Sequence, residues 1–62
     1  MTISENELPN HRKGFADKLD WCTKTLVRRI RHILIEHNAE KLRVWSPKLS
    51  RAIADELGIE VI

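Results

Sequence analysis

The chain has 62 residues, of which 42% are hydrophobic and 32% charged, and its formal net charge is +2. This composition is typical of one small globular domain and excludes a disordered or collagen-like chain. A membrane-spanning helix needs roughly 20 apolar residues, and the longest apolar run here is Ile33-Leu34-Ile35. The N-terminus also lacks the pattern of a secretion signal. We therefore expect a cytoplasmic protein that does not contact membranes.

Metal ions and disulfides are not expected to stabilise this chain. Cys22 is the only cysteine, so no internal disulfide can form. His32 and His37 would point about 140° apart on a helix, which rules out shared coordination of one zinc ion. Domains of this size without a disulfide or a metal commonly gain stability from a second subunit. We therefore expect no cofactor, and we expect a homo-oligomer.

Residues 1–9 are predicted to be a flexible tail. They are polar and acidic, and Pro9 closes the segment. Ser4 and Glu7 have the spacing of a capping box, but little apolar pattern follows them. We therefore predict that residues 1–62 form a single small helical domain whose residues 1–9 are a flexible tail.

A single long amphipathic helix is predicted from about residue 13 to residue 38. Apolar side chains recur there at helical spacing on one stripe, which consists of Phe15, Leu19, Cys22, Leu26, Ile30, Ile33 and His37. Cys22 is expected to be a small apolar filler of the core, and His37 to be partly buried. Gly14 weakens the first turn by about 1 kcal/mol relative to alanine, which favours a start nearer Phe15. Early aspartates and late arginines suit the dipole of such a helix.

A short second helix is predicted at about 47–57. Ser46 and Pro47 provide an N-cap and a proline at the first helical position, and Gly58 is placed as a C-terminal cap. Residues 42–45 and 59–62 each alternate with period 2, which indicates a minimal strand at one of them or a small ribbon between them. We therefore predict an all-α fold. The apolar residues of the short helix are expected to pack on those of the long helix, with Leu49, Ile53 and Leu57 against Leu26, Ile30 and Ile33.

Residues 49–59 resemble the first helix and turn of helix-turn-helix regulators. The match consists of Ala54 and Gly58 at the family's spacing, with Ile59 after the glycine. The resemblance covers about 11 of the 62 residues. The family's recognition helix would begin where this chain reaches Ile62, so the resemblance implies little about DNA binding.

The reverse face of the long helix is the candidate binding site. It carries Trp21, Lys24, Arg28, Arg31, His32 and Ile35, and no acidic residue occurs between the first and the last of these. Like charges at i,i+4, such as Lys24 and Arg28, destabilise an isolated helix by a few tenths of a kcal/mol. One interpretation is that this face is simply exposed to solvent, with the arginine stems lying on apolar neighbours. The other is that it docks onto a partner, because Trp and Arg are the residues that most often contribute binding energy in protein interfaces.

The function that we expect is that of a small non-enzymatic regulatory or adaptor protein that docks onto a larger protein. No glycine-rich loop and no paired acids in a pocket are apparent, so we expect neither catalysis nor a small-molecule substrate. The same basic strip could follow phosphates, which makes a nucleic-acid-binding regulator the alternative. A structural subunit of a larger assembly is a second alternative.

Overall fold

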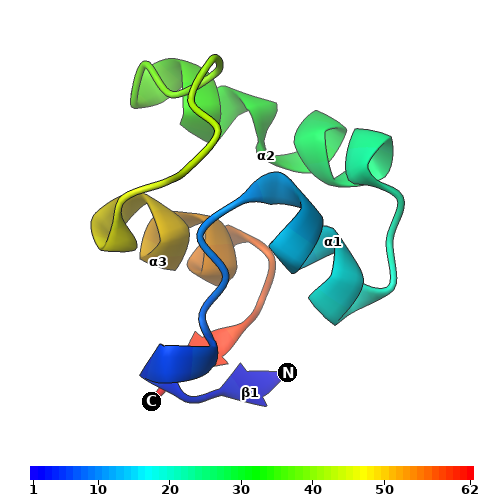
Figure 1. Cartoon of the computed structure of the whole chain (residues 1–62), viewed down its shortest axis with the longest axis vertical. Helices are drawn as coiled ribbons and strands as arrows, with labels where there is room; N and C mark the ends of the chain where they lie inside the picture. The colour runs from blue at the N-terminus through cyan, green and yellow to red at the C-terminus, as the bar shows by residue number, and fades with distance from the viewer.

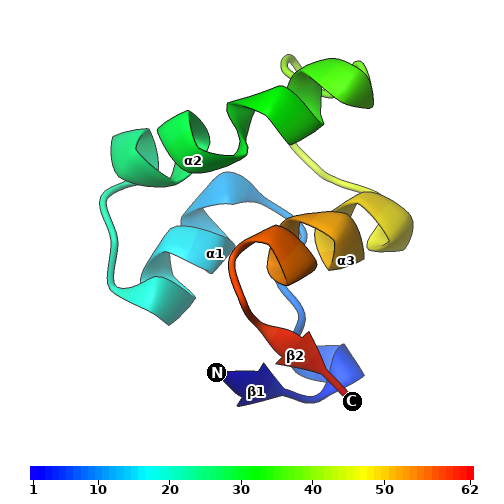
Figure 2. The same ribbon diagram turned by 180° about the vertical axis from the view of Figure 1, so that it is seen from behind.

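Three α-helices and a pair of two-residue strands make up the fold. The computed structural model describes all 62 residues, and its elements are β1 (Thr2–Ile3), the 3-10 helix η1 (Glu5–Glu7), α1 (Arg12–Leu19), α2 (Thr23–Glu36), α3 (Pro47–Glu56) and β2 (Glu60–Val61). Helix α2 lies at one end of the molecule, α1 and α3 lie side by side in the middle, and the strands lie at the other end beside both termini (Figures 1 and 2). No helix has the length and apolar character needed to cross a membrane.

The prediction of one helix over 13–38 is wrong, because the chain breaks between α1 and α2. Asp20 adopts the left-handed conformation, with φ 57° and ψ 40°. The Trp21 amide then donates to the Ala16 carbonyl over 2.9 Å, the bond that closes a Schellman helix end. Asp is among the few residues other than glycine that tolerate this conformation. Cys22 consequently precedes α2 as an exposed cap residue and is not part of the core.

The other two helices end in the same way. Asn38 and Gly58 have φ values of 53° and 76°. The following residues, Ala39 and Ile59, donate their amides to carbonyls five residues back, over 2.7 and 2.8 Å. Both are buried, so each helix end turns an apolar residue into the core. Helix α3 starts at the predicted residue and ends one residue earlier than predicted.

The core lies between the three helices and extends to the strands. Its apolar members are Ile3, Phe15, Ala16, Leu26, Ile30, Ile33, Leu34, Ala39, Trp45, Leu49, Ile53, Ala54 and Ile59. The expected packing of α3 on α2 is present, although Leu57 is only half-buried. His37, which we expected to be partly buried, is exposed because α2 ends at Glu36.

Residues 1–9, expected to be a flexible tail, form β1 and η1 instead. Strand β1 pairs with β2 in parallel, Thr2 opposite Glu60 and Ile3 opposite Val61. Ile3 is 6% exposed and belongs to the core, so burial of its side chain holds this segment against the helices. Of the two predicted strand segments, 59–62 therefore contains a strand, β2. The turn at Gly58, which resembles that of helix-turn-helix regulators, leads into this strand and not into a second helix.

The connection between α2 and α3 is irregular, so a strand at 42–45 is not formed. The Arg12 guanidinium donates to the carbonyls of Glu40 and Leu42, over 2.6 and 2.9 Å, and lies 5.7 Å from the Trp45 ring centroid. A single side chain thus bonds two carbonyls of this connection, and one of them, that of Leu42, lies within the predicted strand. Helix α1 begins at Arg12, before Gly14, whose missing side chain leaves room for the close approach of Pro9.

Candidate functional site

Five of the six predicted site residues share the outward face of α2. Lys24, Arg28, Arg31, His32 and Ile35 are all exposed, whereas the opposite face buries Leu26, Ile30, Ile33 and Leu34. The break at Asp20 does not change their mutual arrangement, because all five lie within α2. We call Lys24, Arg28, Arg31 and Ile35 the outward stripe, since they follow one another at spacings of about one helical turn.

The cations of the outward stripe have no carboxylate partner in the chain. The ion pairs of the molecule are Lys18 with Glu7 and Arg51 with Glu5, and the His32 imidazole contacts Glu56. Ile35 lies at the C-terminal end of this row of cations, one turn after Arg31, and is 51% exposed. The stripe is therefore a row of three unneutralised cations that ends at one exposed apolar side chain.

The position of these cations does not serve the stability of α2. Its first turn contains no acidic residue, and Lys24 lies there instead. The N-terminal end of a helix carries partial positive charge, so a cation at that end is unfavourable. The expectation that the charges suit the helix dipole assumed that α1 and α2 were continuous, and it is wrong for α2. Helix stability therefore gives no reason for this distribution of charge.

His32 lies at the edge of the outward stripe and contacts α3. Its Nε2 is 3.3 Å from Oε1 of Glu56, near the C-terminal end of α3. Both side chains are about half exposed, at 60% and 48%. Because this contact holds the imidazole at the junction of α2 and α3, we do not count His32 as part of the outward stripe.

Trp21 is not on α2, because it lies in the connection that follows α1. Its side chain is 36% exposed, and the Arg29 guanidinium lies 6.0 Å from its ring centroid. Arg29 was not among the predicted site residues, although its position eight residues after the tryptophan is a helical spacing. The pair forms a separate aromatic and cationic patch beside the outward stripe.

Cys22 is an exposed thiol at the start of α2. The backbone amides of Thr25 and Lys24, in the first turn of α2, favour the thiolate and lower the pKa of the thiol from its ordinary value. The thiolate is the nucleophilic form, so folding should increase the reactivity of Cys22 near neutral pH.

We expect Cys22 to be alkylated at lower pH in the folded chain than in the unfolded chain. The rate of reaction with iodoacetamide, measured against pH, should reach half of its maximum at a lower pH in buffer than in concentrated urea. The unfolded chain is the matched control, because it keeps the sequence neighbours and removes the helix. Equal midpoints in the two conditions would show that the α2 amides do not stabilise the thiolate.

The histidine, cysteine and acidic side chains form no group of three or more that is placed to hold a metal ion. The two histidines of the α2 region both lie on its surface, His32 beside Glu56 and His37 at the helix end.

We compared the chain with protein-family models, curated proteins and solved structures. No protein-family model matches the chain, and neither a curated protein nor a solved structure does so.

Proposed function

We propose that this chain is a small non-enzymatic regulatory or adaptor protein that docks onto a larger protein through the outward stripe of α2. The observation that carries the proposal is the exposed Ile35 at the end of a row of three cations that lack carboxylate partners within the chain. An acidic surface with an apolar recess would neutralise the cations and bury the isoleucine. Such a combination of a buried apolar anchor and charge complementarity is usual in protein interfaces.

A solvated helix face would explain the exposure of these residues but not their charge. Neighbouring like charges along the outward stripe destabilise an isolated helix, and Lys24 opposes the helix dipole. A partner that binds the cations offsets both costs. The proposal therefore accounts for a charge distribution that the fold alone does not require.

Nucleic acid is the second candidate, favoured by the four α2 cations without a carboxylate partner, Lys24, Arg28, Arg29 and Arg31. Phosphate contacts make the logarithm of affinity fall by about 0.9 per logarithmic unit of salt for each contact on duplex DNA. Binding in which Ile35 is buried depends less on salt. A titration against mixed-sequence DNA at several salt concentrations separates the two candidates.

Photo-crosslinking from the outward stripe tests the proposal in the cell of origin. A benzophenone amino acid at position 35 should give a discrete protein adduct, and the same probe at the exposed Asp17 of α1 should not. The double variant Arg28→Glu and Arg31→Glu should remove the adduct. Lys13→Glu with Lys48→Glu is the matched control, because it changes the net charge equally at exposed positions outside α2.

Two outcomes would contradict docking onto a protein. One is an adduct at position 35 that nuclease digests, which would support the nucleic-acid candidate. The other is an adduct that the control double variant removes as completely as the stripe variant, which would assign the binding to net charge alone. Circular dichroism of each variant shows that the helices are retained.

A further inference from the structure

Strand β2 has one edge that β1 does not use. The amides of Glu60 and Ile62 donate to carbonyls of β1, to Met1 over 2.8 Å and to Ile3 over 3.0 Å. In a parallel ladder, the residue between two such residues points its amide and carbonyl to the other side. The backbone amide and carbonyl of Val61 therefore face away from β1. An exposed strand edge of this kind can accept a further strand.

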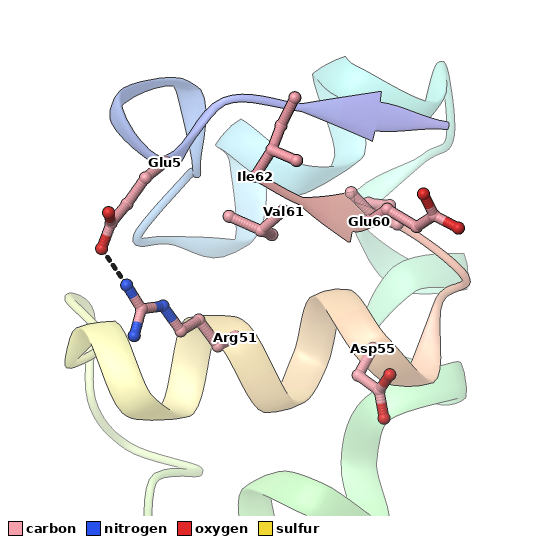
Figure 3. Close-up of a pocket in the computed structure, with 7 residues that line it drawn as sticks. Glu5, Arg51, Asp55, Glu60, Val61 and Ile62 are labelled. Carbon is pink, nitrogen blue, oxygen red and sulfur yellow. Dashed lines mark hydrogen bonds and ion pairs between the residues drawn. The ribbon is translucent and has the colours of Figure 1, made fainter.

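A groove of about 590 Å³ adjoins this edge, between β2 and α3 (Figure 3). Ile59, Val61 and Ile62 provide its apolar part. Its charged lining residues are Glu5, Asp55, Glu60 and Arg51, and Arg51 forms an ion pair with Glu5. The groove therefore carries excess negative charge, and it suits an extended segment with apolar and cationic side chains.

Residues 41–44 of the chain have this composition. Lys41 and Arg43 alternate with Leu42 and Val44, whose side chains are 48% and 64% exposed. Neither cation forms an ion pair within the chain. The polar backbone groups of Leu42 are bonded to Arg12 and Ala39, whereas the amide and carbonyl of Arg43 bond no other group of the chain. The segment has the pattern of a strand without a strand partner.

The groove of one molecule cannot receive its own 41–44 segment. The segment belongs to the connection between α2 and α3, and the strands lie at the opposite end of the molecule (Figures 1 and 2). A second copy can supply the segment. Pairing of two β2 edges with each other is less favourable, because it brings the acidic grooves of both copies together.

We propose that the 41–44 segment of a second copy binds in the β2–α3 groove as a third strand, so that copies associate head to tail. Val61 supplies the backbone hydrogen bonds, and the groove carboxylates neutralise Lys41 and Arg43. The contact is heterologous, so it produces a ring or an open chain instead of a two-fold dimer. It uses no residue of the outward stripe and is independent of the proposed function.

Sedimentation velocity over a range of concentrations tests this association with two variants that act on opposite sides of the contact. Arg43→Glu places a like charge against the groove and should weaken association about tenfold or more. Val61→Pro removes the amide on the free edge and keeps the β1 bonds, which come from neighbouring residues. Arg31→Glu, with the same charge change on the outward stripe, should leave association unchanged.

Mixing the two variants gives the outcome specific to a head-to-tail contact. Each alone should associate much more weakly than the original chain, since one has an impaired segment and the other an impaired edge. Their mixture should form dimers and nothing larger, because only one intact contact is possible, whereas the original chain forms larger species. A two-fold contact predicts no such complementation.

Isotope-mixed crosslinking keeps the proposal testable if Val61→Pro does not fold. A carbodiimide should join Lys41 of a ¹⁵N-labelled copy to Glu60 of an unlabelled copy. The proposal is overturned by a monomer at all concentrations up to about 1 mM, the scale of the weakest specific contacts. It is also overturned by association that Arg31→Glu abolishes and Arg43→Glu leaves intact, or by mixed crosslinks that do not join these two ends of the molecule.

Discussion

Replacing Phe15 with alanine is expected to lower the free energy of unfolding by about 3–5 kcal/mol, a large fraction of the stability of a small domain. The Phe15 side chain is fully buried, and its ring centroid lies 5.7 Å from that of Trp45. The substitution therefore removes the α1 ring that packs on Trp45, the residue before the N-cap of α3, and it leaves a cavity between them. Urea denaturation followed by tryptophan fluorescence measures the effect.

The control for this substitution is Leu42→Ala. Its side chain is 48% exposed, and surface substitutions usually change stability by about 0.5 kcal/mol or less. A loss below about 1 kcal/mol for Phe15→Ala would contradict the burial of this ring, since truncation of a buried phenylalanine costs several times more.

Replacing Arg12 with alanine is expected to lower the free energy of unfolding by about 2–3 kcal/mol. The substitution removes two hydrogen bonds from a charged donor, each worth roughly 1.5–3 kcal/mol, but partial exposure of the side chain reduces the total. It also removes the cation from the Trp45 ring. Hydrogen exchange at residues 40–45 should accelerate, because this side chain holds the α2–α3 connection in place.

Arg12→Lys distinguishes the geometry of the side chain from its charge. A lysine ammonium lacks the planar fork of donors that reaches both carbonyls, so much of the stability should still be lost. Lys13→Ala, at the next and exposed position, is the matched control and should leave both stability and exchange nearly unchanged. Full stability of Arg12→Lys would indicate that charge alone matters at this position.

Local signals explain the parts of the fold that were predictable. Ser46 accepts a hydrogen bond from the Leu49 amide, and Pro47 follows at the first helical position, so the start of α3 follows from side-chain chemistry within four residues. Gly58 at φ 76° ends the same helix for an equally local reason. The phase of the apolar positions identified which face of α2 is buried.

The break at Asp20 was not predictable from periodicity. Phe15, Leu19 and Leu26 keep helical spacing across it, because both α1 and α2 present apolar residues to one core. An aspartate in the left-handed conformation is an uncommon helix end, and no glycine or proline marks it. The same error placed Trp21 on the candidate face, whereas the other five predicted residues lie together on the exposed side of α2.

The pairing of β1 with β2 also has no local signal. Each strand has two residues, and the partners lie at opposite ends of the sequence. Alternation indicated a strand at 59–62 but not its partner, and the two residues of β1 carry no usable alternation. Burial of Ile3 and the backbone hydrogen bonds between the strands make the pairing favourable. Long-range pairing of this kind depends on where the helices bring the chain ends.

The β1–β2 pairing also determines the order in which the molecule can assemble. Thr2 and Glu60 are 58 residues apart, so their contact closes almost the whole chain into one loop. The entropy lost on closure is recovered only after the helices have shortened the distance between the ends. The helices should therefore form and pack first, and the ends should meet last. Because the groove for a second copy is bounded by β2, a partly folded chain lacks that acceptor, and association follows completed folding.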